Sequence, residues 1–121
     1  MLVEFIEAPI FTRLLGTYLT DDEYRLLQAA LSQDPEMGDV VPGTGGVRKL
    51  RWRDARRGQG RRGGLRVIYY YLRADEQIWM LTIYGKDEAK DLTVGERAAL
   101  RRAVEAEKEG RRRARRADPR R

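Results

Sequence analysis

Three segments rich in β-branched and aromatic residues follow one another in the second half of this chain, and they constrain its fold more than any other feature. They are Val47–Arg53, Leu65–Leu72 and Ile78–Tyr84. The connection between the second and third, residues 73–77, has the length of a hairpin loop. Because consecutive strands joined by short loops pair antiparallel, the sequence predicts an antiparallel sheet at the centre of the protein.

The first half of the chain predicts one more strand and two helices. Residues 2–6 are rich in β-formers and predict a short strand. Pro9 suits the first turn of a helix, and apolar residues recur at helical spacing after it. Thr20 and Glu23 match a capping box, which predicts a second helix that runs to about Gln33.

A second capping box, formed by Thr93 and Glu96, predicts a last helix that ends before Gly110. The predicted order is therefore a strand, two helices, three strands and a helix. The fold class is α+β, with helices covering a mainly antiparallel four-stranded sheet. At 121 residues we expect a single domain over residues 1–110. Seven of residues 111–121 are arginine and the segment has no large apolar side chain, so we expect a disordered tail.

Charge is segregated along the chain. Residues 1–47 carry two basic and eight acidic side chains, whereas residues 48–66 carry nine basic and one acidic. A cluster of one sign creates a local positive field that attracts nucleic acid, even though the net charge of the chain is only +6.

Several classes of site are excluded by composition. The chain has no cysteine and no histidine, so disulfides, thiolate metal sites and the usual zinc ligand sets cannot form. We therefore expect no cofactor and no metal. No run of residues approaches the roughly 18 apolar positions of a membrane span, and the expected location is the cytoplasm.

The basic middle of the chain predicts a phosphate-binding face. Lys49, Arg51 and Arg53 alternate along one strand and share one side of it, opposite Leu50 and Trp52. Arg66 opens the next strand, and further arginines lie between the two. The alternative is a solvated, highly charged hairpin that only protects a sheet edge from aggregation. The predicted RNA-binding residues are Arg48, Arg51, Arg53, Arg57, Arg61 and Arg62.

Tyr84 and Lys86 are the candidates for proton transfer, since they lie where the last strand ends. Nearby guanidinium groups would lower the pKa of Tyr84 and favour a phenolate. Such a base, or the amine of Lys86, could take the proton of an RNA 2′-hydroxyl while arginines stabilise the phosphate. This reaction requires no metal. The alternative for Tyr84 is an ordinary aromatic residue at a strand end. The predicted catalytic residues are Lys49, Arg66, Tyr84 and Lys86.

Four passages of the sequence resemble the RelE/HigB-type toxins of bacterial toxin–antitoxin modules, and the HigB-like branch in particular. The passages are Leu19–Leu27, Gly38–Arg51, Arg62–Tyr70, and Leu81–Lys86 together with Leu92 and Thr93. The similarity extends to about Glu109. It implies a compact fold of the microbial-ribonuclease type and ribosome-dependent cleavage of messenger RNA in the A site. It also implies neutralisation by a cognate, HigA-like antitoxin, with contact to DNA only through that antitoxin.

The resemblance also implies roles for individual residues. Lys49, Arg51 and Arg66 match positions that bind and stabilise the scissile phosphate, and Lys86 adjoins another basic position of the family. Asp87 stands where the RelE branch has arginine, and Thr93 where it has its catalytic tyrosine. Tyr84, which HigB-like members share, is the substitute base.

Two other functions fit the same residues. A non-catalytic module that binds RNA or DNA would lose affinity in proportion to the charge removed, and its expression would not arrest growth. A protein that only interacts with other proteins would bind ribosomes with little dependence on salt.

Overall fold

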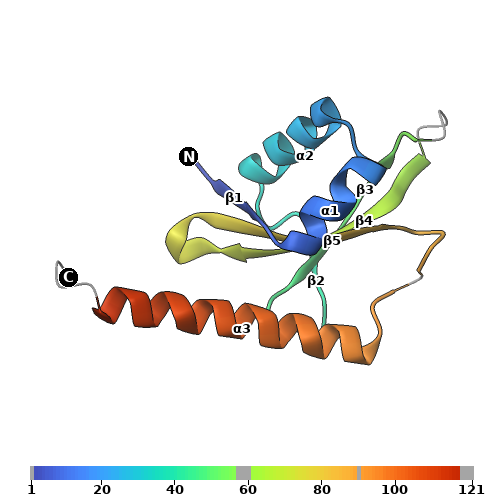
Figure 1. Cartoon of the computed structure of the whole chain (residues 1–121). Helices are drawn as coiled ribbons and strands as arrows, with labels where there is room; N and C mark the ends of the chain where they lie inside the picture. The colour runs from blue at the N-terminus through green and yellow to red at the C-terminus, as the bar shows by residue number, and fades with distance from the viewer. Residues whose placement is uncertain (1, 57–60, 90, 118–121) are drawn as a thin grey trace.

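The computed structural model describes residues 2–56, 61–89 and 91–117, and it has a helical layer on each side of a sheet (Figure 1). The strands are β1 (Glu4–Glu7), β2 (Asp39–Val40), β3 (Arg48–Asp54), β4 (Arg61–Leu72) and β5 (Gln77–Gly85). The helices are α1 (Pro9–Tyr18), α2 (Asp21–Gln33) and α3 (Val94–Ala117), with a short 3-10 helix, η1 (Arg73–Asp75), between β4 and β5.

The predicted α+β class is confirmed, and the predicted sheet is corrected in two respects. The described strands number five rather than four, in the order β1-β5-β4-β3-β2. β1 pairs parallel to β5, whereas the other three pairings are antiparallel, so the sheet is mixed. The extra strand, β2, is only two residues long and carries no periodic signal of its own.

The sheet is buried on both faces, which explains why the sequences of β4 and β5 are nearly continuously apolar. On one face, Leu65, Val67 and Tyr69 pack with α1 and α2. On the other, Ile68 and Tyr70 pack with residues of α3 such as Val104. Alternate residues of a strand point to opposite faces, so each face of the central strands has its own core.

Both capping boxes form as predicted. The Thr20 hydroxyl accepts from the Glu23 amide at 3.2 Å, and the Glu23 carboxylate accepts from the Thr20 amide at 2.8 Å. Thr93 and Glu96 make the same pair of bonds at 3.1 and 2.8 Å. The second box fixes where α3 begins, directly after the loop that follows β5.

Helix α3 is longer than the sequence predicts. It continues through Gly110 to Ala117, so residues 111–117 are helical rather than disordered. The added turns have tertiary partners: the Arg111 guanidinium lies 5.0 Å from the centre of the Trp79 ring, and Asp75 forms ion pairs with Arg111 and Arg115. Within the described ranges, no helix is both long and apolar enough to cross a bilayer.

Candidate nucleic-acid interface

Arg51, Arg66 and Tyr84 form one row across three strands. Arg51 on β3 is the register partner of Arg66 on β4, and Arg66 is the partner of Tyr84 on β5. Side chains directly opposite each other on neighbouring strands have Cβ atoms about 4.5–5.5 Å apart. The row therefore places two arginines and a tyrosine side by side on the face of the sheet against which α3 packs. We call these three residues the cationic row.

Lys49 lies on the same side of β3 as the cationic row, as the alternation predicts. The pairing of β3 with β4 shifts register between Trp52 and Asp54, so the alternation is interrupted at Arg53, which lines a pocket with Glu23 and Leu26 of α2. The Lys49 ammonium is 3.3 Å from a carboxylate oxygen of Asp91, in the loop between β5 and α3. Arg53 is exposed, and neither it nor Arg51 forms an ion pair with any residue in the described ranges. Their charges are therefore accessible to an anion from solution.

Asp91 is the acidic group of this surface. Besides Lys49, its carboxylate pairs with Arg97 of α3 at 3.4 Å and accepts from the Leu92 amide at 2.8 Å. The Leu92 amide and Lys49 hold the pKa of Asp91 below its ordinary value. A charged carboxylate thus occupies the space between Lys49 and Arg97. Any phosphate that binds both cations must displace it.

Tyr84 does not have the environment that the sequence predicted. Its side chain is half-buried, and its hydroxyl oxygen is buried with no hydrogen-bond partner among the described residues. Burial, followed by the negative charge of Asp91, raises the pKa of Tyr84, and the opposing effect of Arg66 does not reverse this. The prediction of a lowered pKa was wrong, because one nearby guanidinium does not outweigh desolvation. Tyr84 is therefore a neutral phenol at physiological pH, able to donate a proton rather than to accept one.

Lys86 lies just beyond the end of β5. Its side chain is exposed, and its backbone amide donates to the carbonyl of Gly64 at 2.8 Å. This bond continues the β4–β5 pairing past Gly85 and fixes the backbone from which the amine extends. The structure places Lys86 at the same end of the sheet as the cationic row.

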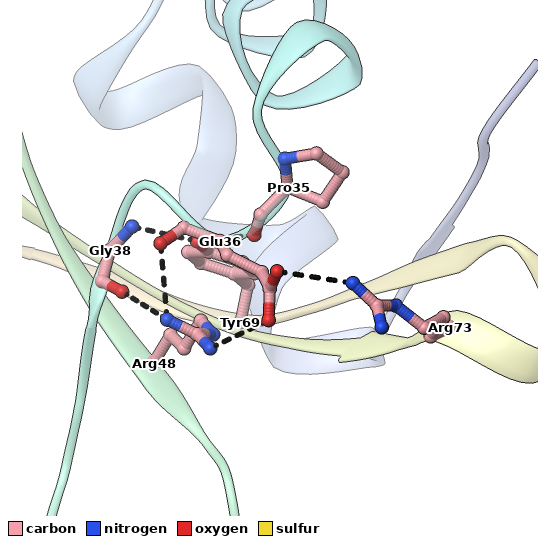
Figure 2. Close-up of polar contacts among 6 residues, drawn as sticks. All are labelled: Pro35, Glu36, Gly38, Arg48, Tyr69 and Arg73. Carbon is pink, nitrogen blue, oxygen red and sulfur yellow. Dashed lines mark hydrogen bonds and ion pairs between the residues drawn. The ribbon is translucent and has the colours of Figure 1, made fainter. Parts of the chain in front are cut away.

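Arg48 is the register partner of Tyr69, so it lies on the opposite face and is not part of this surface. Its guanidinium donates to the Gly38 carbonyl at 2.7 Å and pairs with the Glu36 carboxylate at 3.2 Å (Figure 2). The Tyr69 hydroxyl, in the same cluster, donates to the Pro35 carbonyl at 2.8 Å and accepts from the Gly38 amide at 2.9 Å. Arg48 thus holds the segment between α2 and β2. The alternation that places Lys49 on the cationic face already places Arg48 on the other.

The remaining predicted RNA-binding residues lie at the β3–β4 connection. Arg57 is outside the described residues. Arg61 and Arg62 belong to the β4 backbone, and Arg61 is the register partner of Asp54. Their side chains are also outside what the structure describes.

A polar network beneath the end of the sheet was missed by the sequence reasoning. Arg56 makes two bonds to the Asp54 carboxylate, at 3.1 and 2.9 Å, and lies 4.5 Å from the centre of the Tyr18 ring. Glu88 accepts from the Tyr18 hydroxyl at 2.7 Å and from the Gly85 amide at 3.2 Å. The network ties α1, β3 and the turn after β5 together, and so fixes the backbone between Tyr84 and Lys86.

Arg97 is a further cation that the sequence did not single out. Only the packing of α3 against the sheet brings it to Asp91 and hence near Lys49. No group of three or more carboxylate side chains in the described ranges is arranged to hold a metal ion. No known protein-family model matches the chain.

Proposed function

We propose that this protein is an RNA-cleaving toxin of the RelE/HigB type, a ribosome-dependent messenger-RNA endoribonuclease whose substrate phosphate binds over the cationic row. The main support for the proposal is the Tyr84 hydroxyl, which is buried next to Arg66 and has no hydrogen-bond partner among the described residues. A buried polar group without a partner is costly and calls for an explanation. The hydroxyl is covered in the free protein, so the side chains over it must move before a phosphate oxygen can accept from both Arg66 and Tyr84 and supply the missing bond.

The register of the sheet supports the same proposal. Arg51 and Arg66 are like charges directly opposite each other on neighbouring strands, an arrangement that disfavours pairing. A phosphate between them removes this repulsion, and planar guanidinium groups bind phosphate with two parallel hydrogen bonds.

In the proposed reaction, the 2′-oxygen of a ribose attacks the adjacent phosphorus and the bond from phosphorus to the 5′-oxygen breaks. The products are a 2′,3′-cyclic phosphate and a free 5′-hydroxyl. Arg51 and Arg66 stabilise the charge that develops on the phosphate oxygens. The neutral phenol of Tyr84 donates its proton to the leaving 5′-oxygen, and the proton of the 2′-hydroxyl passes to solvent water. The charged, exposed side chain of Lys86 adds positive charge near the phosphate.

This assignment changes the role of Tyr84 that the sequence favoured. A phenol whose pKa is raised by burial cannot act as a base at neutral pH, but it is suited to act as an acid. Lys49 contributes only after Asp91 moves aside, because its ammonium is occupied in the free protein.

The proposed partners follow from the same resemblance. They are a ribosome with messenger RNA in its A site and a HigA-like antitoxin that covers the cationic face or blocks access to the ribosome. The proposed site of action is the bacterial cytoplasm.

The deciding experiment is inducible expression in bacteria, with the 5′ ends of messenger RNA mapped before and after induction. We expect growth arrest and new 5′ ends at fixed codon positions within translated regions. Arg66→Gln should abolish both, while Arg13→Gln, an exposed arginine on α1, should abolish neither. New ends that fall equally in untranslated regions would contradict dependence on the ribosome.

A non-catalytic RNA-binding module is the second candidate, and the raised pKa of Tyr84 favours it, since Tyr84 was the expected base. This candidate predicts RNA binding that falls with the charge removed, with no new 5′ ends and no arrest. The salt dependence of ribosome binding tests the third function, a purely protein-interacting role, because phosphate contacts release counterions and make binding strongly dependent on salt.

A further inference from the structure

The C-terminal half of α3 carries a second cationic surface, separate from the cationic row. Arg112, Arg113 and Arg116 all pair with a single carboxylate, Glu109, at 2.9 to 3.4 Å. Their side chains are 60%, 76% and 72% exposed. Three guanidinium groups that share one carboxylate leave a net positive charge facing solvent.

This surface is held firmly against the rest of the protein. Arg111 lies over the Trp79 ring, and Arg115 and Arg111 both pair with Asp75 of η1. One turn earlier, the Lys108 ammonium is 3.2 Å from the Tyr70 hydroxyl. The end of α3 therefore lies against the β4–β5 turn (Figure 1). Arg112, Arg113 and Arg116 project from this anchored helix.

Helix stability alone does not explain the charge. Cations in the last turn of a helix are favoured by its dipole, which accounts for Arg115 and Arg116. Arg112 and Arg113 precede that turn, and Arg112 is four residues from Arg116, a spacing at which like charges destabilise a helix. A shallow pocket of about 150 Å³ lies alongside, lined by four cations and one carboxylate. The cations are Lys108, Arg111, Arg112 and Arg115.

We propose that the C-terminal half of α3 is a second polyanion site that binds the phosphate backbone of double-helical nucleic acid. Every residue of α3 is non-aromatic, so this surface offers no platform on which unpaired bases could stack. A duplex requires only phosphate contacts, and a line of guanidinium groups supplies them. Single-stranded nucleic acid is therefore the weaker ligand.

The distance along the helix separates this surface from the cationic row. Arg97, beside Asp91 and Lys49, lies 16 residues before Arg113, which corresponds to about 24 Å at 1.5 Å per residue. One strand of RNA can occupy the cationic row while a duplex occupies the helix. Because both sites are on one molecule, an RNA that contains both a single strand and a duplex should bind more tightly than either part alone. Duplex binding does not depend on cleavage, so it stands or falls independently of the proposed function.

The test is binding of the full chain to a 20-base-pair RNA duplex, a DNA duplex of the same length and a single strand, across a range of salt concentrations. The variant Arg113→Gln/Arg116→Gln removes two charges. Its control is Arg13→Gln/Arg25→Gln, which removes two charges from α1 and α2; Arg25 is 74% exposed, like Arg113. Circular dichroism verifies that both variants keep their helix content.

We expect the first variant to bind duplexes at least fivefold more weakly, with the slope of log affinity against log salt reduced by about 0.9 for each lost contact. The control should change neither quantity. An equal loss of affinity for RNA and DNA duplexes identifies the shared phosphate backbone as the ligand. A larger loss of affinity for the RNA duplex identifies an A-form duplex as the preferred ligand.

Two outcomes would overturn the proposal. One is duplex affinity that is unchanged in Arg113→Gln/Arg116→Gln but lost in Arg51→Gln/Arg66→Gln, which would assign all binding to the cationic row. The other is binding to vesicles of 30% phosphatidylserine that depends on Arg113 and Arg116, without any effect on duplexes. In either case, mapping of 5′ ends would still decide the proposed function separately.

Discussion

Arg51 and Arg66 face each other directly across β3 and β4, and Arg66 in turn faces Tyr84 across β5. Two like charges directly opposite each other on neighbouring strands repel, so replacing one of them should change both the stability of the protein and its affinity for an anion.

Replacing Arg51 by glutamine should raise stability while weakening RNA binding. The variant removes one of the two opposed charges, and the expected gain is below about 1 kcal/mol in the free energy of unfolding. The affinity for a short single-stranded RNA should fall severalfold, with a shallower dependence on salt. Urea unfolding and fluorescence anisotropy measure the two effects. A loss of stability together with a loss of binding would show that Arg51 has a structural role instead.

Tyr84→Phe should also stabilise the protein, by about 1 kcal/mol, because it removes a buried hydroxyl without a hydrogen-bond partner. Messenger-RNA cleavage should be lost in the same variant. Tyr24→Phe is the matched control, since the Tyr24 hydroxyl donates to Glu7 at 2.8 Å and its removal should cost about 1 kcal/mol. Thermal unfolding of the two variants should therefore shift in opposite directions, and a shift in the same direction would contradict the assignment.

Asp91→Asn should strengthen RNA binding by about three- to tenfold, equivalent to roughly 1 kcal/mol. The carboxylate pairs with both Lys49 and Arg97, so its neutralisation frees two cations for phosphate. Asp22→Asn is the control, because it breaks an ion pair with Arg25 on α2 with the same change in net charge. Weaker binding by Asp91→Asn would mean that the carboxylate positions Lys49 for the substrate rather than competing with it.

Gly38→Ala and Gly16→Ala should have opposite effects on stability. A Cβ atom at Gly38 would lie 2.9 Å from the Tyr69 ring and 3.1 Å from the Lys49 carbonyl, so the variant should lose about 1–3 kcal/mol. At Gly16, in α1, nothing lies within 4 Å, and alanine should stabilise the helix by up to about 1 kcal/mol. Chemical denaturation of both variants measures the difference. Little destabilisation by Gly38→Ala would indicate that the segment from Pro35 to Gly38 moves freely.

Stability should fall as the pH rises above 10. Burial is the main cause that raises the pKa of Tyr18, Tyr24, Tyr69 and Tyr84 in the folded protein. Unfolded tyrosine titrates near pH 10, so above that pH the unfolded chain binds fewer protons than the folded one and is favoured. Each phenol contributes up to about 1.4 kcal/mol per pH unit, and this contribution is fully present below pH 10. Urea midpoints at pH 8, 10 and 11 test this. Tyr24→Phe should reduce the loss of stability above pH 10. Equal urea midpoints at all three pH values would contradict the prediction that stability falls.

The sequence alone determined the features that depend on local periodicity and local hydrogen bonds. The two-residue alternation of β3 fixed Lys49 and Arg51 on one side, and two capping boxes fixed the starts of α2 and α3. Tertiary structure decided the rest. The parallel pairing of β1 with β5 joins segments about 70 residues apart, which no local pattern encodes. The arginine-rich end of α3 is helical where it contacts Trp79 of β5 and Asp75 of η1, which are distant from it in the sequence. The pKa of Tyr84 rose because packing buried its hydroxyl and brought Asp91 near, and desolvation depends on which atoms surround a group rather than on its neighbours in sequence.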